Sequence, residues 1–111
     1  MMESEFVVLH TILKEGRGSD YDEIHEVIPG EVAHALRENG VRDWRIWRDG
    51  RHVFHVVEVM DYAFMRAGMA TLPANVAWQS RVAPLFEKPD DYGATGPVVQ
   101  LLWSLNDQMD G

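Results

Sequence analysis

The chain has 111 residues, which is the size of one domain with its own core and too short for two. It contains no cysteine, so disulfides, thiolate catalysis and zinc sites built on sulfur are excluded. Its net charge of −8 repels phosphate backbones and anionic lipid, which disfavours nucleic acid and membranes as partners and favours a small neutral ligand or another subunit.

The first five residues lead directly into an apolar segment and do not resemble a secretion signal. No apolar run reaches the length of a membrane span, so the expected location is the cytoplasm. Residues 6–13 (FVVLHTIL) are rich in β-branched and apolar side chains and predict the first strand. A glycine-rich turn at 15–18 follows.

A helix is predicted from residue 19 to about residue 38. Ser19 and Asp22 have the spacing of a capping box, and apolar residues recur at helical spacing up to an Asn-Gly stop signal. Pro29 lies inside this helix. Because its ring collides with the carbonyl four residues back, which belongs to His25, the pattern predicts a kink there.

Tyr21 and His25 are four residues apart and would share one face of that helix. Histidine transfers protons near neutral pH because its ordinary pKa is about 6.5. A surface pair that packs on a neighbouring element has the same spacing, so the spacing alone leaves both roles open. The position of His25 at the predicted kink favours a proton-transfer site.

The remainder of the chain alternates strands, helices and turns. Strands are predicted at 41–48 and 52–60 with an Asp-Gly hairpin turn between them, helices at 62–71 and from 73 or 75 to about 82, a loop at 86–96 and a last strand at 98–105.

This order, β-α-β-β-α-β, predicts a single α+β domain over residues 1–111 with the ferredoxin-like arrangement. Both helices would cover one face of a four-stranded antiparallel sheet. The first and third strands are apolar on both alternating faces and the last is almost continuously apolar, which is typical of strands buried on both sides. A second copy of the chain would cover the open face, so a homodimer is predicted.

The five histidines do not form a metal-binding pattern. His52 and His55 are three residues apart on a strand, so they point to opposite faces, and no HExxH motif is present. The sequence also lacks a serine-nucleophile motif and a phosphate-binding loop. No metal and no cofactor are therefore expected.

Four tryptophans stand at positions 44, 47, 78 and 103. Core packing is the commoner role of any one tryptophan, because its side chain carries a large apolar area. Sugars also stack on flat aromatic faces, and aromatic side chains with a few polar groups form pockets for small neutral ligands.

Several segments together resemble the L-rhamnose mutarotase family over almost the whole chain. They are the opening strand FVVLHTI, the pattern Tyr21-x-x-x-His25-x-x-x-Pro29-x-Glu31, residues 40–47 (GVRDWRIW) with the hairpin that follows, residues 55–59 (HVVEV) and residues 75–79 (NVAWQ). Their order and spacing carry the resemblance. It implies a dimeric α/β barrel, an isomerase that interconverts the anomers of a 6-deoxy sugar such as L-rhamnose without metal or cofactor.

The resemblance also implies roles for residues. His25 would be the acid/base residue, Tyr21 its polar neighbour at the sugar, and Trp78 a wall of the pocket. Trp44 stands where the family often has a tyrosine, and its indole can only donate a hydrogen bond. This departure leaves open whether the sugar is L-rhamnose or L-fucose, and whether Tyr21, a water or a second side chain pairs with His25.

Two other functions fit the same pattern. One is an oxygenase or haem-handling enzyme on the same dimeric architecture, because a fold does not fix a function. The other is a sugar-binding module without catalysis.

Overall fold

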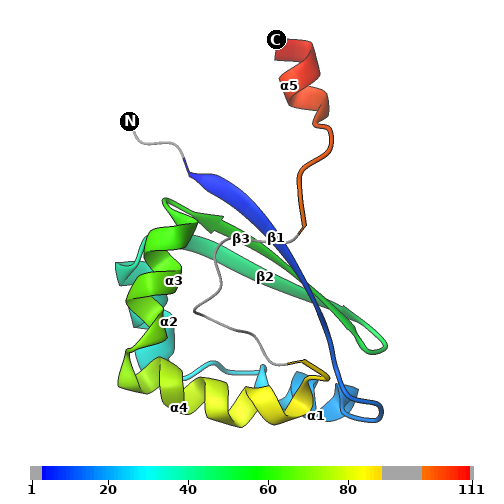
Figure 1. Ribbon diagram of the computed structural model, residues 1–111, viewed down its shortest axis with the longest axis vertical. Coiled ribbons are helices and arrows are strands. Elements are labelled where there is room, and N and C mark those ends of the chain that lie inside the picture. Colours follow the sequence, from blue (N-terminus) through cyan, green and yellow to red (C-terminus); the bar gives the residue numbers. More distant parts are fainter. Residues whose placement is uncertain (1–3, 89–98, 111) are drawn as a thin grey trace.

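The computed structural model describes residues 4–88 and 99–110. Within them, three strands form one antiparallel sheet: β1 (Glu5–Ile12), β2 (Val41–Asp49) and β3 (His52–Val59). Their order is β1-β3-β2, so β1 and β2 run in the same direction with β3 between them. The helices α2 (Gly30–Glu38), α3 (Tyr62–Ala70) and α4 (Pro73–Val82) lie on one side of this sheet (Figure 1).

Local signals set several of these boundaries. Gly50 takes a positive φ of 59° in the turn between β2 and β3, as the Asp-Gly pair predicts. The Asp61 carboxylate accepts a hydrogen bond from the backbone N–H of Phe64 at 3.0 Å and caps α3. Pro73 occupies the first turn of α4, where a missing N–H costs nothing. A single 3₁₀ turn, η1 (Ala83–Leu85), ends this helical run.

The predicted single helix from residue 19 to about 38 is wrong, since the segment forms two helices. The first, α1 (Gly18–Ile24), ends before His25, and the next begins only after Pro29, whose backbone is extended with φ −52° and ψ 134°. Proline cannot donate into a helix and disfavours the helical conformation in the residue before it, so the chain leaves the helix instead of kinking. The capping box is also wrong, because Arg17 is the N-cap residue and no side chain caps α1.

The predicted strand at 98–105 does not form within the described residues. Residue 98 lies outside them, residues 99–104 are irregular, and a short helix, α5 (Leu105–Asp110), follows. This segment extends away from the sheet (Figure 1), and its large side chains are exposed, with Leu102 at 97% and Trp103 at 61%. An apolar segment forms a strand only where it can pair with a neighbouring strand and pack on a surface. The predicted loop at 86–96 lies mostly outside the described residues.

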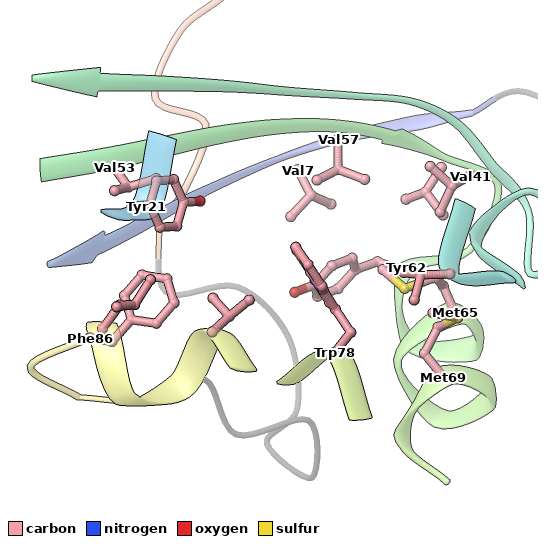
Figure 2. Packing of buried hydrophobic residues seen from close by; sticks show 14 of the residues in the cluster. Val7, Tyr21, Val41, Val53, Val57, Tyr62, Met65, Met69, Trp78 and Phe86 are labelled. Carbon is pink, nitrogen blue, oxygen red and sulfur yellow. The ribbon is translucent and has the colours of Figure 1, made fainter. Parts of the chain in front are cut away.

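The core fills the layer between the sheet and the helices (Figure 2). Alternate residues of β3, Val53, Val57 and Val59, point into it and are fully buried, and Met65 and Met69 of α3 meet them from the other side. This alternation follows from the period of two along a strand. Close to α1 and α4 the layer is not filled, and a cavity remains.

Candidate active site

A cavity of about 240 Å³ lies between the helix-covered face of the sheet and the helices. Pockets for drug-sized ligands run from about 300 to 1,000 Å³, so this volume suits a smaller molecule. Apolar side chains form most of its wall, together with a set of polar or aromatic ones: Thr11, Tyr21, His25, Trp44, His55, Asn75, Trp78 and Gln79. The structure therefore brings all four predicted site residues, Tyr21, His25, Trp44 and Trp78, to one cavity.

Tyr21 enters the cavity wall from α1 and is 2% exposed. Its ring stacks on that of His25, with centroids 3.9 Å apart and an angle of 27° between the planes. Burial raises the pKa of the Tyr21 phenol well above its ordinary value, and the negative charge of Asp22 raises it further. The phenol therefore keeps its proton near neutral pH and offers a neutral hydroxyl.

His25 follows the last residue of α1, half-buried, and its ring meets the edge of Trp78 at a centroid distance of 5.2 Å. Its Nδ1 lies 2.9 Å from the carbonyl oxygen of Tyr21. A carbonyl oxygen only accepts, so Nδ1 carries the proton and Nε2 holds the lone pair. Burial lowers the pKa of His25, while this hydrogen bond and Asp22 oppose the shift. A neutral imidazole with one accepting nitrogen is a general base.

Trp44 and His55 form a second pair, from β2 and β3. The indole Nε1–H of Trp44 donates to Nδ1 of His55 over 3.1 Å, and Oγ1 of Thr11 lies 3.4 Å from Nε2 of the same ring. His55 was absent from the predicted site because only metal binding was considered for it. Strand alternation was the signal for it: His52 and His55 point to opposite faces, as predicted, and this places His55 with the core residues.

Asn75 and Gln79 of α4 were also absent from the predicted site. They stand three residues before and one residue after Trp78, so all three share one helix face toward the cavity. Asn75 is 2% exposed, and its Nδ2 donates to the carbonyl oxygen of Met69 over 2.9 Å. That bond fixes the orientation of the Asn75 amide. The helical spacing of NVAWQ was the signal that Asn75 and Gln79 share the face of Trp78.

The other two tryptophans and Arg45 lie elsewhere. Trp47 is 53% exposed on the opposite face of the sheet, and Trp103 lies in the segment before α5. Arg45, which is close to Trp44 in the sequence, is exposed and pairs with Asp43 over 2.9 Å. These three do not line the cavity.

An ion pair ties α1 to the end of β2. Nε and Nη2 of Arg48 bind the two oxygens of the Asp22 carboxylate, at 2.7 and 2.5 Å. The hydrogen bond from Arg48 lowers the pKa of Asp22, so this carboxylate stays charged at neutral pH. The pair holds α1, and with it Tyr21 and His25, against the sheet.

Features of two other kinds of site are missing from the part of the chain that the structure describes. Within residues 4–88 and 99–110, no three His, Cys, Asp or Glu side chains gather in a way that could hold a metal ion. Among the helices of the same residues, none combines the length and the apolar character needed to cross a bilayer.

Fold and cavity together define a class: small α+β proteins that enclose a compact site with acid/base side chains. A family model described as L-rhamnose mutarotase matches residues 7–105, so the chain belongs to the L-rhamnose mutarotase family, which are carbohydrate-isomerising enzymes. The crystal structure of L-rhamnose mutarotase FA22100 from Formosa agariphila shares the fold, with a TM-score of 0.71 and 20% identity over 91% of this chain and 99% of that one. No curated protein matches the chain.

Proposed function

We propose that the protein is a mutarotase that interconverts the α and β anomers of a 6-deoxy sugar, L-rhamnose or L-fucose, by acid/base catalysis without a metal. The observation that carries this proposal is the state of His25. A half-buried imidazole with its proton fixed on Nδ1 and its lone pair on Nε2 lines a cavity of about 240 Å³. Family membership supports the proposal independently.

Mutarotation requires little chemical equipment. The cyclic hemiacetal opens to an aldehyde, the bond next to the aldehyde rotates, and the ring closes on the other face. The anomeric hydroxyl loses a proton and the ring oxygen gains one, with no covalent intermediate. A positioned acid or base contributes about 10²–10⁴-fold to such a step, and a histidine that is neutral at working pH suits the role of base.

The neighbours of His25 have separate parts in this proposal. Tyr21 holds the imidazole plane by stacking and offers its protonated hydroxyl to the sugar. Trp78 and Trp44 line the same cavity and supply aromatic surface for the C–H faces of the sugar. The methyl group of a 6-deoxy sugar suits a wall that is mostly apolar.

We also propose that two copies pair through the open face of the sheet, in the dimeric barrel that the resemblance implies. On that face Phe6, Trp47 and Phe54 are 69%, 53% and 39% exposed, and in the segment before α5 Leu101 and Leu102 are 79% and 97% exposed. Large apolar side chains that are exposed together on one face are typical of an interface. The segment 99–105 of one copy would cover the sheet of the other copy and add a fourth strand to it.

The dimer has its own test. Analytical ultracentrifugation of the full chain should give a dimer, and Trp47→Asp should shift it toward the monomer, because a charge would enter an apolar interface. An outward-facing control, Glu31→Gln on α2, should leave the dimer intact. A wild-type protein that stays monomeric at high concentration would remove this part of the proposal.

The activity is tested by saturation-transfer NMR on L-rhamnose and L-fucose with the purified protein. Wild type should accelerate exchange between the anomers of one or both sugars. In His25→Ala the catalysed exchange rate should be lower by about 10²–10⁴-fold. The matched control is His34→Ala, which changes an exposed histidine of α2. Full exchange by His25→Ala would remove His25 from the role.

The same experiment separates the alternative functions. A sugar that binds in a saturable way without faster exchange would indicate a non-catalytic sugar-binding module. A new Soret band on addition of haem, lost in His25→Ala, would indicate the haem-handling alternative.

A further inference from the structure

The proposed reaction needs a second group besides His25. Electron density builds up on the ring oxygen as the ring opens, and a hydrogen-bond donor must meet it there. Tyr21 is a neighbour of His25, but its hydroxyl already serves to bind the sugar in the proposed function, and its ring is stacked on the imidazole. The opposite wall of the cavity offers another candidate, on β3.

We propose that His55 is this second catalytic residue: its Nε2–H donates a hydrogen bond to the sugar oxygen that gains negative charge, and Trp44 holds it in the tautomer that can donate. This inference deepens the proposed mutarotase function and rests on it. It assigns Trp44 to positioning as well as to lining the cavity.

The tautomer of His55 follows from its partner. An indole N–H donates and never accepts, so Nδ1 of His55, 3.1 Å from Nε1 of Trp44, must accept. In the neutral ring the proton then sits on Nε2. A phenol at position 44 could either donate or accept, and it would leave both tautomers of His55 open.

The geometry of His55 also fits a donor whose orientation is fixed. His55 is 8% exposed, lines the cavity, and meets the Trp44 ring edge-on at 5.9 Å and 83°, so its plane is fixed. Its Nε2 lies 3.4 Å from Oγ1 of Thr11, beyond the usual range of about 2.7–3.2 Å. A sugar oxygen at normal distance would therefore make a better acceptor than this hydroxyl.

The two histidines of the cavity then carry opposite tautomers. Tyr21 gives His25 a carbonyl, which fixes the proton on Nδ1 and leaves an accepting Nε2. Trp44 gives His55 an N–H, which fixes the lone pair on Nδ1 and leaves a donating Nε2. One cavity thus holds one base and one donor built from the same side chain.

The proton balance closes without a further reactant. Nε2 of His25 takes the proton of the anomeric hydroxyl. The oxygen of that hydroxyl forms the C1=O bond, and the bond from C1 to the ring oxygen breaks. The electron pair goes to the ring oxygen, which His55 stabilises by its hydrogen bond. The imidazolium of His25 then returns the proton to that oxygen, which was attached to C1 until the bond broke and therefore still lies close to Nε2. Ring closure reverses these steps after rotation, and His55 keeps its proton throughout.

The first test reads the tautomers directly. Long-range ¹H–¹⁵N spectra of the labelled wild-type protein should show an unprotonated Nδ1 in His55 and an unprotonated Nε2 in His25. Addition of L-rhamnose should move the Nε2 resonance of His55 more than its Nδ1 resonance. A protonated Nδ1 in neutral His55 would overturn the inference, whatever the activity.

The second test uses variants in the anomer-exchange assay. His55→Leu should lower the maximal rate by about 100-fold, with a smaller effect on half-saturation, because the lost bond belongs to the transition state. His55→Gln retains an N–H near the position of Nε2 and should recover much of this loss. Trp44→Phe keeps an aromatic ring but removes the indole N–H and should also lower the rate.

Controls separate the possible failures. His34→Leu should match wild type, and circular dichroism should show that each variant is folded. If His55→Leu does not fold, the comparison of His55→Gln with Trp44→Phe and the tautomer spectra decide. Active wild type with His55→Leu within about twofold of it would overturn the inference and leave the proposed function standing. Wild type without faster exchange would overturn the proposed function itself, and the inference with it.

Discussion

On the helix-covered face of the sheet, His25 and His55 are each bound to a group that can act in one way only, a carbonyl and an indole N–H. On the opposite face, His10 and His52 are exposed and stacked, with Nε2 of the first 2.9 Å from Nδ1 of the second. Either ring can donate in that pair. A histidine therefore gains a defined proton position from the chemistry of its partner.

The aromatic residues repeat this contrast. Trp78 is 7% exposed inside the layer and meets His25, whereas Trp47 is 53% exposed on the other face. Trp78 therefore contributes both to the core and to the cavity. Trp47 can contribute only to contacts with whatever covers the outer face of the sheet. The two faces of the sheet, and the ion pair that links α1 to β2, should therefore respond differently to substitution and to pH.

The largest effect is expected for Trp78→Ala set against Trp47→Ala. Removal of the buried indole should lower the free energy of unfolding by about 3–5 kcal/mol, because it leaves a large void. The outer change should cost less than about 1 kcal/mol in the monomer. Urea denaturation at a low protein concentration, where subunit association contributes little, measures both. Equal losses would contradict the contrast.

A finer comparison uses neighbouring valines of β3. Val57 is fully buried and Val56, on the outer face, is only half-buried. Val57→Thr keeps the shape but buries a hydroxyl, which should cost about 1–3 kcal/mol. Val56→Thr should stay near wild type, since water or a neighbour can satisfy its hydroxyl. Thermal unfolding of the two variants checks this, and a larger loss at Val56 would show that the outer face is the more deeply buried one.

The pH dependence tests the inner face through His25. Because burial lowers its pKa, the base form should persist below the ordinary value of about 6.5, and the exchange rate should fall only at lower pH, by about tenfold per unit. The unfolded chain binds this proton more readily, so the free energy of unfolding should also fall as the pH drops below about 6.5. Exchange rates and NMR titration of His25 measure the midpoint. A midpoint above 6.5 would contradict its burial.

The smallest effect is expected for Arg48→Ala, which cuts the ion pair between β2 and α1. Both partners are accessible to water, so the stability should change less than in any variant above, and least at high salt. The exchange rate should fall modestly, because α1 carries Tyr21 and His25. Chemical denaturation at low and high salt, with Arg45→Ala as the matched control, checks this expectation. A loss as large as that of Trp78→Ala would show that the pair, and not the core, fixes α1.

Local signals made much of the fold predictable. The Asp-Gly hairpin and the apolar first strand depend on a few adjacent residues, and each forms as predicted. The effect of Pro29 was not predictable, because the packing of the two segments decides whether a proline bends a helix or ends it. The absence of a strand in residues 99–105 was not predictable either, since strand formation depends on a partner strand outside the segment.

The same division holds for the site. Tyr21 and His25 lie in one turn of chain, so spacing alone could pair them. His55 is bound by Trp44, which lies eleven residues earlier in the sequence and reaches it diagonally from the neighbouring strand. Such a contact depends on register and rotamer, and a sequence shows neither. The inward side of β3 could be predicted, but not the partner that gives His55 its tautomer.

The carbonyl oxygen of Tyr21 receives two hydrogen bonds from one residue, from the backbone N–H of His25 at 3.1 Å and from its ring at 2.9 Å. The acceptor is main chain, so no substitution at position 21 can delete it. A substitution can therefore change the side chain that position 21 places in the cavity while the proton of His25 stays on the same nitrogen. The lining of the cavity and the proton position of His25 are thus separately mutable in this segment, although one residue contributes to both.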